Sequence, residues 1–446
     1  MTDPRPRLLL VCALLAFPLA ATRAADDLHQ RVSAKVDAEY PSLNALYQDL
    51  HTHPELSFME EHTSALMAKE LRASGFTVTE KVGGYGVVAV LRNGPGPTLL
   101  VRADMDALPV KEQTGLPYAS SVVMKDFTGK EMPVMHACGH DSHLTCLIGT
   151  SRVLASVRDQ WSGTLVLIAQ PAEEVGGGAR AMLMDGLYTR FPRPDTVIAF
   201  HTAGDMPAGE VGYVEGASYA NVDSVDILVR GIGGHGARPQ STRDPIVLAA
   251  EIITSLQTIV SRELKPGTPA VVTVGTIHGG NKRNIIPSEV KLELTLRSYD
   301  EDVATHLVAS IRRICANTAR AAGLPEDLLP VVTVTEGRTP LTYNDPALTR
   351  RLAGVFHAWF PAERVKIGEA ATYGEDFSEY GRTRDRIPIC IFWVGGTDPA
   401  KFAESARTGQ PWASNHSAFW APVPEPTIKT GVTATSAAVL DLLAKK

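Results

Sequence analysis

The chain has few cysteines, no internal repeats and no low-complexity linker. These absences argue against a repeat architecture and against long flexible connections between domains. Composition is ordinary, with 44% hydrophobic and 21% charged residues, which is typical of a soluble globular protein and excludes a disordered one. A length of 446 residues allows two or three domains with a substantial core.

Basic charge is also scarce. The chain contains 43 Lys and Arg against 49 Asp and Glu, and its formal net charge is −6. Nothing resembles the basic surface of a nucleic-acid-binding protein, so no nucleic-acid partner is expected. Because an acidic protein attracts anions poorly, an anionic substrate would have to be met by local arginine or lysine side chains.

The first long apolar run covers residues 8–20 and is shorter than the roughly 20 residues that a membrane-spanning helix needs. Arg5 and Arg7 precede it, and small residues surround a predicted cut after Ala24. This pattern predicts a secretory signal over residues 1–24. An uncleaved anchor or a buried helix is the alternative. We therefore expect a periplasmic or extracellular protein without a stable membrane anchor after the signal is removed.

Four cysteines lie beyond the predicted signal: Cys138, Cys146, Cys315 and Cys390. Cys138 stands among histidines, which favours a role as a metal ligand. The remaining three are an odd number, so we expect few or no structural disulfides. These three are expected to be small buried apolar residues.

Strands and helices alternate over most of the chain. Helices are expected within residues 27–75, at 141–158 and at 178–187. Short apolar strands are expected at 87–91, 99–101, 165–169 and 197–200. Such alternation predicts an α/β domain with a mostly parallel sheet and helices on both faces.

The pattern changes over residues 219–336. Its expected elements, in the order β-α-β-β-α-β, are 222–229, 245–262, 270–277, 289–298, 304–321 and 331–334. This order predicts a ferredoxin-like α+β lobe. Helix and strand alternate again afterwards, so the lobe is expected to be inserted into one catalytic domain made of residues 25–218 and 337–446.

Side chains of the metal-ligand type follow several of these strands. One strand leads to Asp104 and Asp106, another to Glu173 and Glu174, and a third to His201. Further candidates stand elsewhere in the chain: Cys138, His140 and His416. The carboxyl ends of parallel strands meet at one edge of a sheet, where open α/β sheets bind their ligands. The pattern therefore predicts one polar site, most simply that of a dinuclear metal hydrolase.

The chemistry of these residues supports a metal site. Cys138 and His140 can reach one cation or a pair from a single turn, and sulfur and nitrogen donors favour zinc, cobalt or manganese over calcium. Of the adjacent Glu173 and Glu174, one could bind metal while the other takes a proton from water whose pKa the metal lowers. Asp106 could hold a ligating histidine by its second nitrogen. The alternatives are a loop histidine beside a buried cysteine, a solvated acidic pair and a turn-forming aspartate.

The motifs resemble the amidohydrolase branch of the aminoacylase and hippurate hydrolase family, which is related to dinuclear metallopeptidases. The resemblance covers nearly the whole predicted mature chain and rests on residues 51–57, 102–109, 135–141, 170–174, 233–237, 284–287, 375–377 and 416. One departure is Gln240, where relatives commonly carry histidine, and it touches no proposed ligand.

The resemblance implies a ligand set and a cofactor. The implied ligands are Cys138, His140, Glu174, His201 and His416, and the general base is Glu173. They would hold two divalent metal ions per subunit, manganese or zinc, with cobalt or nickel as alternatives. The fold it implies is a catalytic domain with an inserted ferredoxin-like dimerisation lobe.

The resemblance also implies roles for the lobe, which would join subunits into a homodimer or higher homo-oligomer. His235 would reach the partner's active site and stabilise the developing oxyanion. Asn284 and Arg297 would contact the substrate carboxylate, for which an arginine fork is well suited. The alternatives are a loop histidine in a glycine-rich turn and an arginine that pairs with a surface acid.

The leading hypothesis is a metal-dependent amidohydrolase. It would use metal-activated water, with Glu173 as the base, to cleave N-acyl amino acids or short peptides with a free carboxylate. A cysteine amidase with Cys138 as nucleophile is an alternative, although it leaves the other ligand-type residues without a role. A catalytically silent binding protein for acyl amino acids or peptides is the third hypothesis. The acyl group and the amino acid preferred stay open.

Overall fold

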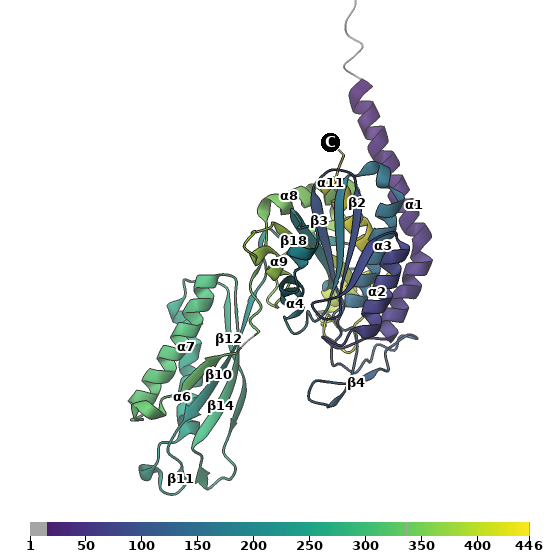
Figure 1. The fold of residues 1–446 in the computed structure, drawn as a ribbon. Coiled ribbons are helices and arrows are strands. Elements are labelled where there is room, and N and C mark those ends of the chain that lie inside the picture. The colour runs from purple at the N-terminus through teal and green to yellow at the C-terminus, as the bar shows by residue number, and fades with distance from the viewer. Residues whose placement is uncertain (1–15, 336, 446) are drawn as a thin grey trace, which may run out of the picture.

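The computed structural model describes residues 16–335 and 337–445. It has two parts, a domain around an eight-stranded sheet and a lobe around a four-stranded sheet (Figure 1). Most of the predicted signal lies outside the described residues. Its last part belongs to the backbone of helix α1 (Ala16–Thr52). Within the described ranges, no helix is both long enough and apolar enough to cross a membrane.

The large sheet is mixed, and its four central strands are parallel. In spatial order its strands are β1 (Thr77–Val82), β2 (Gly86–Asn93), β6 (Gly163–Gln170), β3 (Thr98–Asp104), β7 (Thr196–Pro207), β18 (Ile389–Thr397), β8 (Val211–Tyr213) and β17 (Val365–Ile367). The expected α/β fold is confirmed. Three strands run against the central four. Strand β2 does so because a tight turn joins it to β1 as a hairpin, and β8 and β17 do so at the other edge of the sheet.

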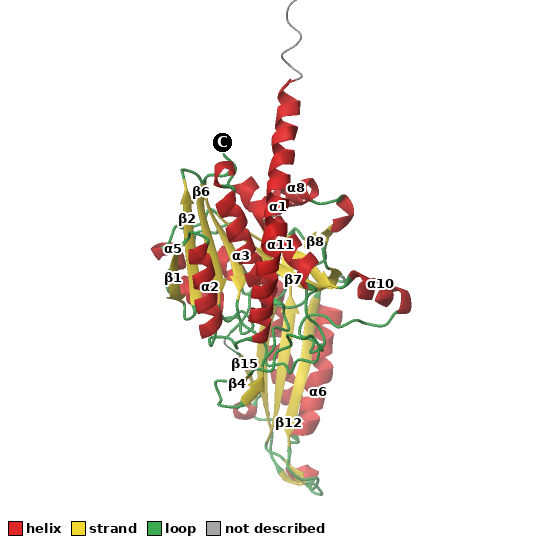
Figure 2. Ribbon diagram, turned by 90° about the vertical axis from the view of Figure 1, so that its right-hand side faces the viewer, coloured by secondary structure: helices red, strands yellow, loops and turns green. Residues whose placement is uncertain are grey.

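Helices cover both faces of this sheet (Figures 1 and 2). The helices on one face are α1, α2 (Glu61–Ala73), α3 (His140–Ser156), α8 (Pro346–Trp359) and α11 (Pro424–Leu442). Those on the other are α4 (Gly178–Met184), α5 (Leu187–Arg190) and α9 (Ser378–Arg382). Strand β6 feeds both cores, since Leu165 and Leu167 face one and Val166 and Ile168 the other. A strand buried on both faces is apolar throughout. This is why strand β6 could be predicted from the sequence.

The lobe has its own hydrophobic core and projects from the large domain (Figure 1). Its strands, in spatial order, are β12 (Ala270–Gly279), β14 (Glu289–Ser298), β10 (Asn221–Arg230) and β15 (Val331–Val334), all antiparallel. Helices α6 (Pro245–Thr258) and α7 (Glu301–Ala321) pack against the sheet, and the chain order matches the expected β-α-β-β-α-β. A short pair at the far end consists of β11 (Gly234–His235) and β13 (Ile285–Ile286).

Several helices begin at the same local signal, an aspartate whose carboxylate accepts a backbone N–H of the first turn. Asp244, Asp345 and Asp398 cap α6, α8 and α10 (Pro399–Thr408), and each is followed by proline. Proline suits the first helical position because its missing N–H would be unpaired there. The projecting helix α10 is seen in Figure 2.

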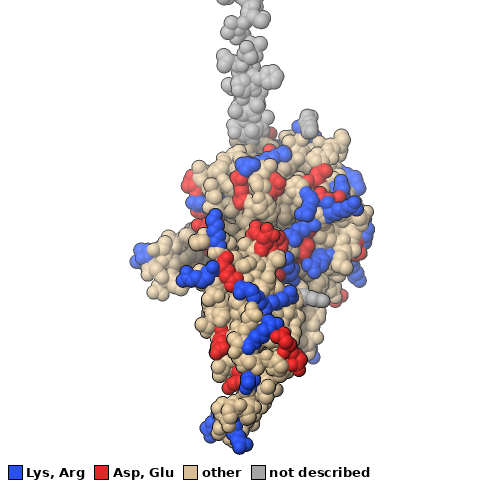
Figure 3. All heavy atoms as spheres, turned by 90° about the vertical axis from the view of Figure 1, so that its left-hand side faces the viewer, with Lys and Arg blue, Asp and Glu red and all other residues tan. Residues whose placement is uncertain are grey.

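The remaining strands form two short pairs. One is β9 (Gly216–Tyr219) with β16 (Thr342–Asn344), where the chain enters and leaves the lobe, and the other is β4 (Val123–Lys125) with β5 (Glu131–Pro133). The four cysteines that the structure describes are buried and free. Basic and acidic side chains are interspersed over the face drawn in Figure 3.

Candidate active site

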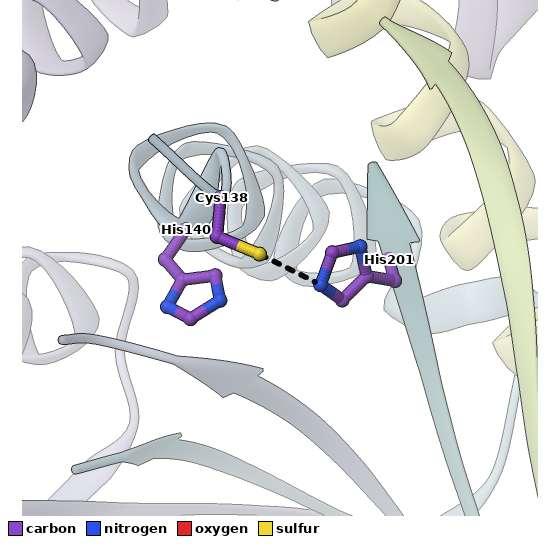
Figure 4. A group of neighbouring side chains, drawn as sticks. All are labelled: Cys138, His140 and His201. Carbon is purple, nitrogen blue, oxygen red and sulfur yellow. Dashed lines mark hydrogen bonds between the residues drawn. The ribbon is translucent and has the colours of Figure 1, made fainter. Parts of the chain in front are cut away.

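The five side chains named as ligands converge at the carboxyl edge of the large sheet. Cys138 and His140 stand at the start of α3, His201 on β7, Glu174 in the turn after β6, and His416 in the loop before α11. The sulfur of Cys138 lies 3.4 Å from Nε2 of His201 (Figure 4). It lies 3.2 Å from Nε2 of His416. Nε2 of His140 lies 3.8 Å from Oε1 of Glu174.

Unusual backbone conformations set up these side chains. Gly139 has a φ of 87°, which lets the chain turn between the thiol and the first helical residue. Ala172 and His416 have φ values of 53° and 67°, which non-glycine residues adopt only when their surroundings hold them there. Hydrogen bonds donated by their backbone N–H groups hold both residues in these conformations. The N–H of Ala172 donates to the Glu60 carboxylate at 2.8 Å, and that of His416 donates to a backbone carbonyl at 2.7 Å.

The carboxylate of Asp106 holds the two glutamates in place. It accepts the backbone N–H groups of Glu173 and Glu174 at 3.0 and 2.9 Å and the hydroxyl of Ser57 at 2.6 Å. The expected contact with a ligating histidine is made mainly by the backbone. Nδ1 of His140 lies 2.7 Å from the carbonyl oxygen of Asp106 and 3.5 Å from its carboxylate.

His143 supports the site through hydrogen bonds of both its ring nitrogens. Its Nε2 accepts the backbone N–H of Thr202 at 2.7 Å, so the proton of the neutral ring lies on Nδ1. That nitrogen lies 2.5 Å from the carboxylate of Asp104. The ring of His143 thereby links Asp104, at the end of β3, to Thr202 on β7, which follows His201 directly.

A buried arginine cluster adjoins the candidate ligands, and the sequence analysis did not predict it. The guanidinium of Arg102 lies 2.6 Å from Asp104, 2.8 Å from Glu375 and 3.1 Å from Asp376, and all four side chains are buried. The available signal was a charged residue inside the apolar run of β3, which must find a partner when buried. Three carboxylates surround one guanidinium, so negative charge is in excess.

Burial and neighbouring carboxylates raise the pKa values of the two adjacent glutamates. The pKa of Glu173 is raised well above its usual range, first by burial and then by Glu375 and Glu174. The pKa of Glu174 is raised to about 8, mainly by burial. Burial, followed by the neighbouring Glu174, also raises the pKa of the Cys138 thiol. A bound cation would reverse these shifts, because it would stabilise the charged forms.

The residues present fit divalent metal ions. Nε2 of His140 and Oε1 of Glu174 are buried and have no hydrogen-bond partner within the described part of the chain. Native proteins rarely leave buried polar atoms unpaired, and these two point to the same place. Thiolate, imidazole and carboxylate together are a donor set for zinc and related metals.

Comparison with known proteins agrees with this geometry. Residues 100–416 match the model of the peptidase family M20/M25/M40. The chain belongs to this family. It is 35% identical over 356 residues to thermostable carboxypeptidase 1 of Saccharolobus solfataricus, covering 79% of this chain and 85% of that one. It is 41% identical over 276 residues to hippurate hydrolase of Campylobacter jejuni, covering 61% and 68%.

Solved structures show the same fold. The YXEP protein of Bacillus subtilis, described as a dinuclear metal binding peptidase from the M20 family, superposes with a TM-score of 0.73 and is 27% identical. The match covers 91% of this chain and 99% of that one. The resemblance drawn from sequence is therefore confirmed, and the chain is an M20 family hydrolase, in a family that includes amidohydrolases and carboxypeptidases.

Three lobe residues of this M20 hydrolase were predicted to act in catalysis or substrate binding. They do not join the candidate metal ligands of their own chain. His235 is exposed on β11 at the far tip of the lobe (Figure 1). Asn284 lies beside it, since its carbonyl accepts the N–H of Gly236 at 2.9 Å. The guanidinium of Arg297, on β14, donates to the hydroxyl of Thr295 at 2.6 Å. Their roles stay predictions.

A second buried ion cluster was also missed. Nδ1 and Nε2 of His51 lie 2.6 Å from Asp141 and 3.0 Å from Glu112. Burial opposes protonation of this ring, but the two carboxylates outweigh it and raise the pKa of His51 to about 9. The cluster ties the end of α1 to the start of α3, next to His140. Its members are far apart in sequence, so no local pattern linked them.

Proposed function

We propose that this M20 hydrolase cleaves the amide bond of N-acyl amino acids, or of short peptides with a free carboxylate, with the help of two divalent metal ions. One observation carries the proposal. Two ligand triads overlap at Cys138, one with His140 and His201 and the other with Glu174 and His416, each within 4.8 Å. The donors suit manganese or zinc, with cobalt or nickel as alternatives. Such ions, when bound, lower the pKa of water and polarise a carbonyl.

Glu173 is the general base in this proposal. Its backbone is held by Asp106, and its carboxyl group lies in a buried, acidic surrounding that raises its pKa. A carboxylate there takes a proton from the attacking water as the oxygen bonds to the scissile carbon. The same proton then passes to the nitrogen as the C–N bond breaks, which yields a carboxylic acid and an amine.

The lobe tip is proposed to act in a partner subunit. His235 and Asn284 lie together, away from the ligand cluster of their own chain, so they could serve catalysis only in another copy. A homodimer formed through the lobe would allow this. Mixing Glu173→Ala with His235→Ala subunits tests it, because one site in four of a randomly mixed population would be complete. Recovery of roughly a quarter of the activity supports the proposal, and no recovery after verified subunit exchange contradicts it.

Secretion is proposed from the sequence signal at residues 1–24. Helix α1 runs through the predicted cut, so cleavage after Ala24 would shorten this helix without touching a ligand residue. Amino-terminal sequencing of the protein recovered outside the inner membrane should read from Ala25. A chain that keeps residues 1–24 would favour the anchor.

Amino-acid release is the direct test of the activity. Purified protein with manganese or zinc is given N-acetyl, N-benzoyl and dipeptide substrates, with chelator in parallel. Chelator-sensitive release is expected, and Glu173→Ala should keep its metal but lose nearly all turnover. Release that survives chelation would instead favour Cys138 as a nucleophile. Tight ligand binding without release, with metal bound, would favour a binding protein.

A further inference from the structure

A cavity of about 640 Å³ lies beside the ligand cluster, at the carboxyl end of β7. Ala203 lines it and lies two residues after His201 on the same strand, so both side chains face the same side of the sheet. Trp393 lines it from β18, where it pairs directly with His201 across the two strands. The cavity therefore adjoins the part of β7 that carries His201.

Aromatic rings connect the ligand cluster with the cavity. The ring of Tyr219 lies 6.3 Å from that of His201 and 5.4 Å from that of Tyr373, and its hydroxyl accepts the indole N–H of Trp393 at 2.7 Å. Tyr373 lines the cavity, and Phe402 of α10 completes its aromatic lining. Flat apolar faces of this kind pack well against methylene chains and also attract cations.

The charges around the cavity are unbalanced. Asp205 and Glu369 line it, are exposed, and have no ion pair or hydrogen bond in the described ranges. Its one lysine, Lys366, is already paired with Glu210 at 3.4 Å. The cavity thus repels the carboxylate end of an N-acyl amino acid, so the acyl end is the part that enters it.

The position of the acids sets the length of that acyl group. Asp205 lies four residues beyond His201, and because β7 is irregular after Ala203 the two Cα atoms are at most roughly 13 Å apart. A group that reaches Asp205 is therefore separated from the scissile carbonyl by several bonds. A short acetyl group would leave the cavity empty.

We propose that this cavity selects an extended acyl chain that ends in an ammonium group, as in an ω-amino acyl group of the lysine type. The methylene stem packs against Tyr373 and Phe402, and the ammonium group lies between Asp205 and Glu369. The inference rests on the proposed amidohydrolase function and specifies its acyl preference.

Three alanine conjugates of similar length test the proposal, with N-(ω-aminohexanoyl), N-heptanoyl and N-adipoyl groups. We expect kcat/KM for the ammonium substrate to exceed that for the neutral one by about tenfold, and the carboxylate substrate to be the slowest. Asp205→Asn and Glu369→Gln should each lower the ratio of ammonium to neutral substrate by at least about threefold. Glu363→Gln is the matched control, since Glu363 is exposed and lies six residues before Glu369 in the sequence but does not line the cavity. It should leave the ratio unchanged.

The outcomes separate the two proposals. If the substrates are hydrolysed in a chelator-sensitive way but the ammonium group gives no advantage, the cavity inference is wrong and the proposed function stands. If the ratio falls equally in all three variants, the effect is general electrostatics and the inference is also wrong. If none of these conjugates, and no acetyl or benzoyl substrate, is hydrolysed with metal bound, the proposed function fails and the inference fails with it.

Discussion

Replacing Asp106 by asparagine tests how the two glutamates are held. The carboxylate of Asp106 is fully buried and accepts three hydrogen bonds, two from the backbone of the Glu173–Glu174 turn and one from Ser57. An amide has the same shape but only one accepting oxygen. Its NH₂ group would face a backbone N–H, and two donors cannot pair.

The expected magnitude follows from these contacts. A hydrogen bond to a charged group contributes about 1.5–3 kcal/mol, and a buried N–H left unpaired costs about 1–3 kcal/mol. We therefore expect Asp106→Asn to lower the free energy of unfolding by about 3 kcal/mol. Glu173 and Glu174 would also shift relative to the other site residues. A displacement near 1 Å commonly costs about a hundredfold in rate, so kcat/KM should fall by about that factor.

Urea denaturation, metal analysis and steady-state kinetics on the same preparation measure these effects. Ser57→Ala is the control, because it removes one of the three bonds and leaves both backbone contacts, at a cost of about 1.5 kcal/mol. Asp106→Asn with a wild-type urea midpoint and wild-type kcat/KM would refute the reasoning. Loss of stability without loss of activity would show that the turn is held by other contacts.

Three further predictions concern stability. Arg102→Met should lower the free energy of unfolding by about 3–5 kcal/mol, because three buried carboxylates lose their partner. The loss should be smaller at pH 5 than at pH 8, since the raised pKa values of Glu375 and Asp376 let these carboxylates bind protons at the lower pH. A urea midpoint of Arg102→Met equal to that of wild type would contradict this prediction. The pKa of His51 rises from about 6.5 in the unfolded chain to about 9, so its contribution is complete below pH 6.5 and is lost as pH rises through 9. Between pH 6.5 and pH 9, the urea midpoint of wild type should fall more than that of His51→Gln. The same dependence of both midpoints on pH would exclude a charged His51 paired with its two carboxylates. Chelation should lower the Tm by a few degrees, reversibly on adding manganese, because metal binds only the folded state; an unaltered Tm would argue against structural coupling.

Most of the fold could be predicted from local patterns. Buried strands such as β6 and the first part of β7 contain uninterrupted apolar runs, and the lobe follows from alternating residues along β14. The candidate ligands were recognisable because donor-type residues recur after strands whose carboxyl ends meet. The pairing direction of β2 was not predictable from its composition, since parallel and antiparallel buried strands have the same residues.

Within the site, the sequence by itself determined the kinds of donor atoms, their places at the ends of strands and the catalytic class they suit. Only the tertiary structure decided that His416 meets Cys138, that the Asp106 carboxylate holds the glutamate turn, and that Arg102 neutralises acids distant in sequence. It also placed His235 at the tip of the lobe and Asp205 beside an aromatic cavity. The physical reason is the distance along the sequence over which each interaction acts. Propensity, periodicity and capping act between neighbours in the chain, whereas these contacts join residues that only the packing of the whole fold brings together.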